Sequence, residues 1–324
     1  MRAPNFWRRN GLVPRLLSPV AALYAQAARR RIARGRPQRL PVPLICVGNL
    51  VAGGAGKTPV ALAVAAALQD GGVTPVFLTR GYGGREAGPL VVQADQQSAE
   101  AVGDEPLLLA RQAVTVMARD RPAGAALAIE SGAQVIVMDD GFQNPSLAKD
   151  LSLLVVDAAY GFGNGRVMPA GPLREDLSAG LGRASGVVVL RGAETAREVA
   201  LPSGLPRLDA ALRPARSDLA GRRVLAFAGI GRPEKFFASL ETLGAVLVER
   251  LAFADHHRYR ADELSRLRQR AEAAGCTLIT TEKDMARLPA PERFGIDTLP
   301  VSVVWDDPAQ LEALLRPIVE AAGG

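Results

Sequence analysis

The stretch GNLVAGGAGKTP, from Gly48 to Pro59, constrains the fold of this chain more than any other. It follows the apolar run PLICV and precedes a helical pattern, so the sequence predicts a strand, a glycine-rich turn and a helix in succession. Backbone N–H groups of such a turn bind phosphate, and the helix dipole adds to the attraction. The stretch nearly matches the phosphate-loop pattern G-x-x-x-x-G-K-[ST], except that Val51 replaces the first glycine. We call residues 49–56 the glycine loop.

The residues in and after the glycine loop are those that a nucleotide site requires. Lys57 would reach the β- and γ-phosphates, and Thr58 would hold Mg²⁺. We therefore predict a nucleotide-binding segment, which consists of Gly53, Gly54, Ala55, Gly56, Lys57, Thr58 and Pro59.

A second apolar run, in AQVIVMDDGFQN, predicts a strand that ends in Asp139 and Asp140. A carboxylate at the end of a buried strand beside a phosphate loop is where a second Mg²⁺ contact is expected. Three further features are weaker. Asp104, in AVGDEPLLLA, reads as a helix cap when taken alone. The glycine- and proline-rich residues 161–175 are interpreted as an acceptor-binding or lid element, and FADHHRY holds both histidines of the chain at a strand-to-helix junction.

Short apolar runs alternate with helical patterns along the chain, which is typical of parallel α/β proteins. We predict strands at residues 42–47, 73–79, 135–138, 153–157, 187–190, 223–228, 245–250, 277–281 and 299–304. Helices are predicted at residues 59–69, 105–113, 121–131, 233–243, 261–274 and 308–321, and residues 191–222 read as a crossover or linker. The prediction is a P-loop NTPase-like domain with a mostly parallel sheet over residues 41–215, a smaller α/β domain over residues 216–324, and a ligand cleft between them.

Charge is distributed unevenly between the amino-terminal segment and the rest of the chain. The first 69 residues carry eleven Lys and Arg and no Asp or Glu, whereas the remainder carries 28 basic and 33 acidic residues. Within residues 1–40, apolar side chains recur at helical spacing ahead of a run of arginines, and no stretch reaches the roughly 20 apolar residues that a membrane span needs. We predict an amphipathic helix on an anionic membrane surface. The alternative is a helix packed on the protein's own body.

Seven motifs occur in the order found in the tetraacyldisaccharide 4'-kinase family, the lipid A 4'-kinases of Gram-negative bacteria, which the chain resembles over most of its length. The motifs are GNLVAGGAGKTP, RGYGG, VGDEP, MDDGFQN, GPLRE, FADHHRY and TTEKD. Members of this family carry GGxGKTP without the first consensus glycine, so Val51 fits the family pattern. FADHH lacks the proline that many members have before the aspartate, a small departure.

The resemblance implies an enzyme of lipid A and lipopolysaccharide biosynthesis. It would use ATP and Mg²⁺ to phosphorylate the 4'-hydroxyl of tetraacyldisaccharide 1-phosphate, at the cytoplasmic face of the bacterial inner membrane. By motif, Asp104 becomes the base for the sugar hydroxyl and His256 its partner, with Lys57 and Asp140 also catalytic. Thr58, Asp139 and Glu105 would lie at the metal, and the residues that would line the substrate are Arg80, Asn144, Arg174, Glu175 and His257.

Two other classes of protein are alternatives. A partitioning or delivery ATPase or GTPase often carries a lysine where this chain has Ala52, and its guanine site needs N/T-K-x-D, which TEKD approaches only superficially. A nucleic-acid-binding module could use the arginine-rich end, but the acidic body and the lack of a recognised binding fold disfavour it.

Overall fold

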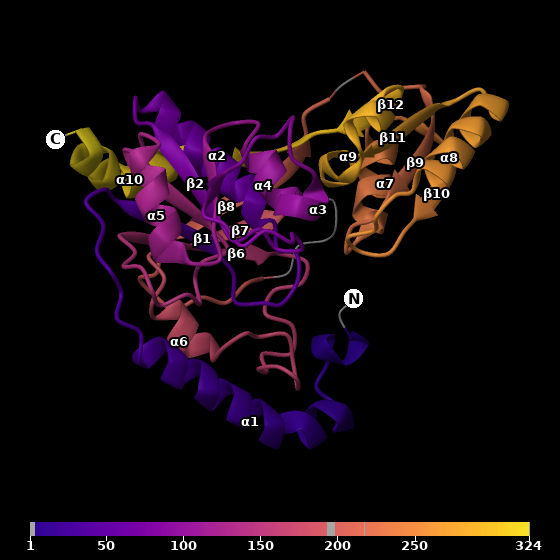
Figure 1. The fold of residues 1–324 in the computed structure, drawn as a ribbon. Helices are drawn as coiled ribbons and strands as arrows, with labels where there is room; N and C mark the ends of the chain where they lie inside the picture. The colour runs from indigo at the N-terminus through magenta and orange to yellow at the C-terminus, as the bar shows by residue number, and fades with distance from the viewer. Residues whose placement is uncertain (1–3, 193–197, 217, 324) are drawn as a thin grey trace.

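Two sheets organise the chain (Figure 1). The computed structural model describes residues 4–192, 198–216 and 218–323. Within these residues the larger sheet has nine strands, in the order β13-β8-β7-β6-β1-β5-β2-β4-β3, and only the outermost pairs β13–β8 and β3–β4 are antiparallel. Its strands are β1 (Leu44–Gly48), β2 (Pro75–Thr79), β3 (Leu90–Val91), β4 (Thr115–Met117), β5 (Val135–Asp139), β6 (Leu151–Asp157), β7 (Gly186–Arg191), β8 (Arg207–Pro214) and β13 (Val301–Trp305). The predicted mostly parallel α/β fold is confirmed.

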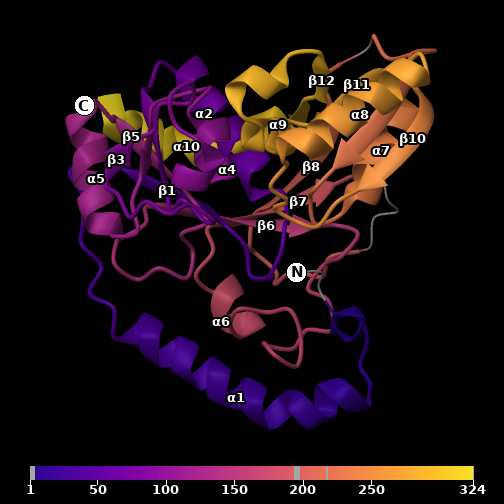
Figure 2. The ribbon, with the colours of Figure 1, turned by 45° about the vertical axis from the view of Figure 1, so that its right-hand side comes forward.

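The smaller sheet is parallel throughout its described strands, in the order β10-β9-β11-β12. They are β9 (Arg223–Ala228), β10 (Val246–Ala252), β11 (Thr277–Thr281) and β12 (Ile296–Leu299). One face packs on α7 (Pro233–Thr242), and the other packs on α8 (Ala261–Ala273) and α9 (Glu282–Arg287). This body lies beside residues 99–109 of the larger one, where Arg287 pairs with Asp104 and Lys283 pairs with Glu105 (Figure 2).

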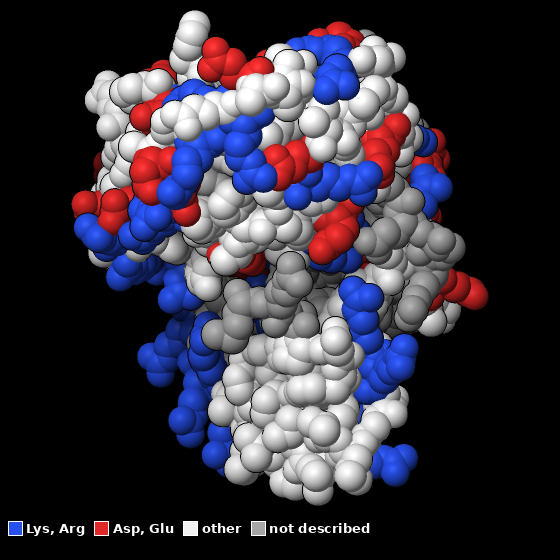
Figure 3. Space-filling view, turned by 90° about the vertical axis from the view of Figure 1, so that its right-hand side faces the viewer, with Lys and Arg blue, Asp and Glu red and all other residues white. Residues whose placement is uncertain are grey.

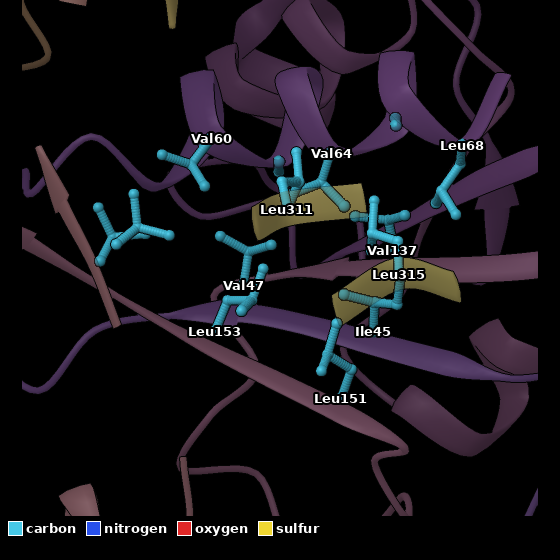
Figure 4. Packing of buried hydrophobic residues seen from close by; sticks show 14 of the residues in the cluster. Ile45, Val47, Val60, Val64, Leu68, Val137, Leu151, Leu153, Leu311 and Leu315 are labelled. Atoms are coloured by element: carbon cyan, nitrogen blue, oxygen red, sulfur yellow. The ribbon is translucent and has the colours of Figure 1, made fainter. Parts of the chain in front are cut away.

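Helices cover both faces of the larger sheet, which explains its nearly continuous apolar strands. Alternate residues of β1 point to opposite faces: Ile45 and Val47 pack with α2 (Lys57–Asp70) and α10 (Pro308–Gly323), as Figure 4 shows. Leu44 and Cys46 pack on the other side with α5 (Arg121–Glu130) and α6 (Leu177–Leu181). The short helices α3 (Ala99–Val102) and α4 (Asp104–Leu109) lie toward the smaller sheet.

The end of the chain returns to the larger sheet, which corrects two expectations. Residues 191–222 were expected to be a crossover, but their described part contains β8, which pairs with β7. The strand predicted at 299–304 divides at Pro300 into β12 and β13, since proline has no N–H for a ladder. β13 pairs with β8, and α10 packs on α2. Residues 301–323 therefore lie in the first domain rather than the second, because an apolar pattern specifies an element but not its sheet.

The amino-terminal segment forms η1 (Asn5–Arg8) and the helix α1 (Leu12–Ala33), which lies apart from both sheets along the lower edge of Figures 1 and 2. Leu12, Leu16 and Leu23 on one face are 72%, 70% and 68% exposed, whereas Pro14 and Ala21 on the other are buried. The predicted amphipathic helix is confirmed. No helix in the described ranges is long and apolar enough to cross a membrane.

Because α10 completes the core of the larger sheet, shortening one of its buried side chains will destabilise that domain. Leu315→Ala is expected to lower the free energy of unfolding by about 2–5 kcal/mol, the usual cost of such a cavity. Denaturant titration followed by circular dichroism measures this. Glu312→Ala, at an exposed position of the same helix, is the control and should change it by less than about 0.5 kcal/mol. Equal stabilities of the two variants would contradict the placement of α10.

Candidate active site

The glycine loop joins β1 to α2, and its first residues are held by a neighbouring segment. Val51 is buried and forms an antiparallel bridge with Leu173. Ala52 N donates to Pro172 O at 2.8 Å, and Arg174 N donates to Leu50 O at 2.8 Å. The loop therefore begins as extended backbone, for which a β-branched residue is suited and a glycine is not needed.

The second half of the glycine loop depends on glycine. Gly53 and Gly56 have φ of 116° and 89°, the region that side chains rarely adopt. A Cβ on Gly56 would also lie 2.3 Å from Leu190 Cδ2. The Asn49 amide donates to Val51 O at 2.7 Å and to Gly53 O at 3.3 Å, which braces the loop from inside. The loop backbone therefore lies next to the amino-terminal end of α2, where N–H groups and the helix dipole favour a phosphate.

Asp139 lies against the first turn of α2 because β5 is the neighbour of β1. Its Oδ2 accepts a hydrogen bond of 3.0 Å from Thr58 Oγ1. Its Oδ1 is buried and has no hydrogen-bond partner in the described part of the chain. Burial, and then the charge of Glu105, raise the pKa of Asp139. A buried carboxylate oxygen without a donor, next to a hydroxyl, fits a hard cation such as Mg²⁺.

Asp140 is held differently, by two cations. Burial alone would raise the pKa of Asp140, but the charges of Lys57 and Arg174 outweigh it and keep that pKa low. Lys57 Nζ lies 3.6 Å from Oδ2, and Arg174 Nη1 donates to Oδ1 at 2.8 Å. The backbone of Asp140 is left-handed, with φ of 55°, a conformation that is costly for a non-glycine residue. The two aspartates, which the sequence could not tell apart, therefore have separate environments.

Glu105, expected at the metal, points toward the second domain. Its Oε1 accepts from Lys283 Nζ at 2.9 Å. Among the residues that the structure describes, no group of three or more His, Cys, Asp or Glu could hold a metal ion. Mg²⁺ characteristically takes one or two carboxylates and completes its shell with phosphates and water. Thr58 and Asp139 are the pair in this site that suits that mode.

Asp104 is not a helix cap, which corrects the interpretation from the residues alone. Gly103 occupies the cap position, and Asp104 is the first residue of α4, only 4% exposed. Its Oδ2 accepts from Arg287 Nε at 3.0 Å and also from Arg287 Nη2, and His256 Nδ1 lies 3.6 Å from the same oxygen. Within the described residues no donor reaches Oδ1, so this oxygen is left for another group.

Arg287 is the residue that the sequence reasoning missed. Its guanidinium links Asp104 of the first domain to Asp284 of the second, donating from Nη1 to Asp284 Oδ1 at 2.9 Å and to Gly229 O at 2.6 Å. Asp284 is fully buried and accepts further bonds from Gly229 N, Tyr259 Oη and Thr281 Oγ1. The TTEKD motif contained Asp284, and Arg287 follows one helical turn later, which was the available signal.

His256, rather than His257, faces Asp104. The pKa of His256 is raised, chiefly because of Asp104. Its backbone is left-handed, with φ of 57°, and its N–H donates to Gly229 O at 3.0 Å. His257 instead stacks on Phe253 with ring centroids 4.7 Å apart, and its Nε2 lies 3.2 Å from Glu263 Oε2. His257 therefore belongs to the packing of the second domain.

The remaining substrate candidates have mixed positions. Glu175 is buried, pairs with Arg183 through both carboxylate oxygens and accepts from Gln143 at 3.1 Å. Asn144 accepts from the backbone and side chain of Ser146 in a turn. Arg174 reaches Asp140, as described above, and Arg80 is exposed. The structure thus brings Arg174 to the loop, and it uses Glu175 and Asn144 to support the segments around it.

Removing the Arg287 charge will leave two buried carboxylates without their shared cation. Arg287→Met is expected to cost about 3–5 kcal/mol of folding free energy, as for other broken buried pairs. Arg287→Lys, which keeps the charge but loses the fork, should cost less. Denaturant unfolding measures both. The control is Arg268→Met, whose partly exposed pair with Glu292 should contribute no more than about 1 kcal/mol. Similar losses for Arg287→Met and the control would contradict this account.

Comparisons with known proteins agree on one family. The family model described as tetraacyldisaccharide-1-P 4'-kinase matches residues 13–320. A tetraacyldisaccharide 4'-kinase of Paramagnetospirillum magneticum is 53% identical over 326 residues, covering 100% of this chain and 99% of the relative. That of Rhodospirillum rubrum is 52% identical, covering 98% of each.

A solved structure is similar along almost the whole chain. It is the "apo" form of LpxK from Aquifex aeolicus in complex with ATP, with a TM-score of 0.78 and 29% sequence identity, covering 95% of this chain and 100% of that one. Sequence and structure therefore point the same way, and the chain belongs to the tetraacyldisaccharide-1-P 4'-kinase family.

Proposed function

We propose that this protein is the lipid kinase that transfers the γ-phosphate of ATP to the 4'-hydroxyl of tetraacyldisaccharide 1-phosphate in lipid A biosynthesis. The observation that carries the proposal is the position of Asp104, whose Oδ2 is held by Arg287 and His256 while Oδ1 has no donor among the described residues. Such a carboxylate, with the glycine loop in the same domain, suits transfer of phosphate to a hydroxyl. Membership of the family supports it.

The nucleotide would lie on the glycine loop. Its backbone N–H groups and Lys57 would bind the β- and γ-phosphates, while Arg174 and Lys57 balance Asp140. Thr58 and Asp139 would hold Mg²⁺, which would supply positive charge to neutralise the phosphates during transfer. The unpartnered Oδ1 of Asp139 supports this assignment.

In the transfer step, Asp104 Oδ1 would take the proton of the 4'-hydroxyl. The 4'-oxygen forms a bond to the γ-phosphorus as the bond from that phosphorus to the β–γ bridging oxygen breaks, and ADP leaves. Positioning and charge stabilisation contribute most to such reactions, and a base adds about 10²–10⁴-fold. Since His256 and Arg287 come from the second domain, the base is held only when the domains are together.

The acceptor is an anionic glycolipid, so the enzyme would work at the cytoplasmic face of the inner membrane as a peripheral or monotopic protein. The exposed apolar face of α1 supports this, and so do the arginines around it. Figure 3 shows that the lower end of the molecule, where η1 and α1 lie in Figure 1, is white and blue without red. Arg80 and Arg174 remain the proposed contacts to the substrate, with Asn144, Glu175 and His257 in supporting positions.

The reaction is tested with γ-labelled ATP, Mg²⁺ and tetraacyldisaccharide 1-phosphate in detergent. We expect label in the lipid, and a kcat about 10²–10⁴-fold lower for Asp104→Asn, with ATP binding retained because this residue does not contact the glycine loop. Label that is unaffected by Asp104→Asn would keep the kinase and reject the base. ATP turnover without labelled lipid would reject the kinase in favour of a switch ATPase.

Membrane attachment is tested by placing charge on the exposed face of α1. Leu16→Glu with Leu23→Glu should abolish sedimentation with vesicles that contain anionic lipid, since both side chains would be buried at the interface. The control is the double variant Ala22→Glu with Gln26→Glu. It adds the same charge at two exposed positions of α1 outside the leucine face. Point variants are preferable to deleting residues 1–36, because Trp7 Nε1 donates to Pro169 O and Arg166 Nη1 donates to Ser18 Oγ. Equal binding by both double variants would rule out this surface.

A further inference from the structure

The loop that follows β9 contacts both halves of the site. At one end, Gly229 O accepts from Arg287 and from His256 N, and Gly229 N donates to Asp284. At the other end, Arg232 reaches across to the first domain, where its Nη2 donates to Gly54 O of the glycine loop at 3.4 Å. Four residues of the second domain therefore join the environment of Asp104 to the phosphate-binding segment.

The Arg232 guanidinium is held by one carboxylate through Nη2, while its Nη1 is buried without a partner among the described residues. Its Nη2 is paired with Asp157, the last residue of β6, and Lys235 Nζ lies 3.0 Å from the same carboxylate oxygen. β6 is the neighbour of β1, so Asp157 lies next to the glycine loop. Arg232 Nη1 is buried and has no hydrogen-bond partner within residues 4–192, 198–216 and 218–323. An unpaired, buried guanidinium N–H is costly unless a ligand satisfies it.

We propose that Arg232 is a phosphate-contacting residue of the kinase, supplied by the second domain, whose Nη1 binds the terminal phosphate of ATP while Asp157 holds Nη2. This inference rests on the proposed phosphoryl transfer. The ligand must be an anion with oxygen acceptors, because a guanidinium offers only donors. The contact with Gly54 O places the guanidinium beside the loop that would bind those phosphates.

The chemistry gives such a residue a role in the transfer step itself. As the bond to the β–γ bridging oxygen breaks, negative charge grows on the phosphate oxygens, and an arginine at that position stabilises it. Arginine suits this role better than lysine, because its guanidinium has enough N–H donors to bind a carboxylate and a phosphate at the same time. Because Arg232 lies on the domain that also carries His256 and Arg287, closure would position the groups around the acceptor and the transferred phosphate together.

The rival explanation is that Arg232 only joins the domains through Asp157. The two explanations predict different relative affinities for ATP and ADP. A phosphate contact discriminates between ATP and ADP, whereas a domain link treats them alike. They also differ for Asp157, whose removal breaks its pairs with both Arg232 and Lys235. A domain link therefore predicts that Asp157→Asn is at least as damaging as Arg232→Gln. A phosphate contact predicts that Arg232→Gln is the more damaging for ATP.

The experiment compares Arg232→Gln, Arg232→Lys, Asp157→Asn and the wild type. Calorimetric titration gives the affinities for a non-hydrolysable ATP analogue and for ADP, each with Mg²⁺, and the lipid-labelling assay gives kcat and KM for ATP. Arg207→Gln is the matched control, since it breaks a two-bond arginine–aspartate pair on β8 away from the loop. Thermal unfolding checks that each variant folds, and Arg232→Lys, which keeps the charge beside Asp157, serves if Arg232→Gln does not.

We expect Arg232→Gln to bind the ATP analogue about tenfold or more weakly, with ADP affinity within about twofold of wild type, and kcat to fall about 10²-fold. Arg232→Lys should be intermediate, and Asp157→Asn should retain the preference for the triphosphate. Equal losses for both nucleotides, or identical behaviour of Arg232→Gln and Asp157→Asn, would overturn the proposal. The binding measurements need no lipid, so they decide the role of Arg232 even if the wild type labels no lipid and the proposed function fails.

Discussion

The interaction on which the site depends is the Arg287 guanidinium between two buried carboxylates, Asp104 and Asp284. Arg287 and Asp284 pair within the second domain, whereas Asp104 of the first domain has this cation only when the two domains are together. Removing charged groups from water costs several kcal/mol per ion, and only good geometry with further hydrogen bonds offsets it. Asp284 has those bonds from Gly229, Tyr259 and Thr281. Arg287 therefore arrives at Asp104 already oriented by its own domain.

This arrangement connects stability to chemistry. The charges that keep Asp104 ionised are also those that hold the domains together, since burial would otherwise raise its pKa and His256 and Arg287 lower it. The strained backbones of His256 and Asp140 fit the same picture, because left-handed non-glycine residues persist only where the surrounding contacts determine them. Each domain thus has one residue with an unfavourable backbone conformation at the site, Asp140 in the first and His256 in the second.

How much could be predicted from the sequence follows from how local each signal is. The glycine loop, Lys57, Thr58 and the aspartates after β5 are contiguous patterns in a strand–loop–helix context, and their elements were predicted within a few residues. Asp104 is different: its local pattern predicts a cap, and only the family resemblance indicated otherwise. Arg287 has only a weak local signal, its place one helical turn after Asp284, and Arg232 has none; their partners in the first domain lie 183 and 75 residues away. β13 was assigned to the wrong domain for the same reason, because the sequence of a strand does not show which distant strand it pairs with.

The return of β13 to the larger sheet makes the second domain an insertion between two adjacent strands. The chain leaves after β8 and returns before β13, and the two crossings touch, because Ala215 N donates to Pro300 O at 2.9 Å. Arg216 adds bonds to Asp297 and to Thr298 O on the returning side. A body joined at both ends through one narrow junction has few residues whose backbone angles could change, which is the arrangement of a hinge. Two connections also keep the polar edge of the second domain near the glycine loop, at a higher effective concentration than a single flexible linker would give.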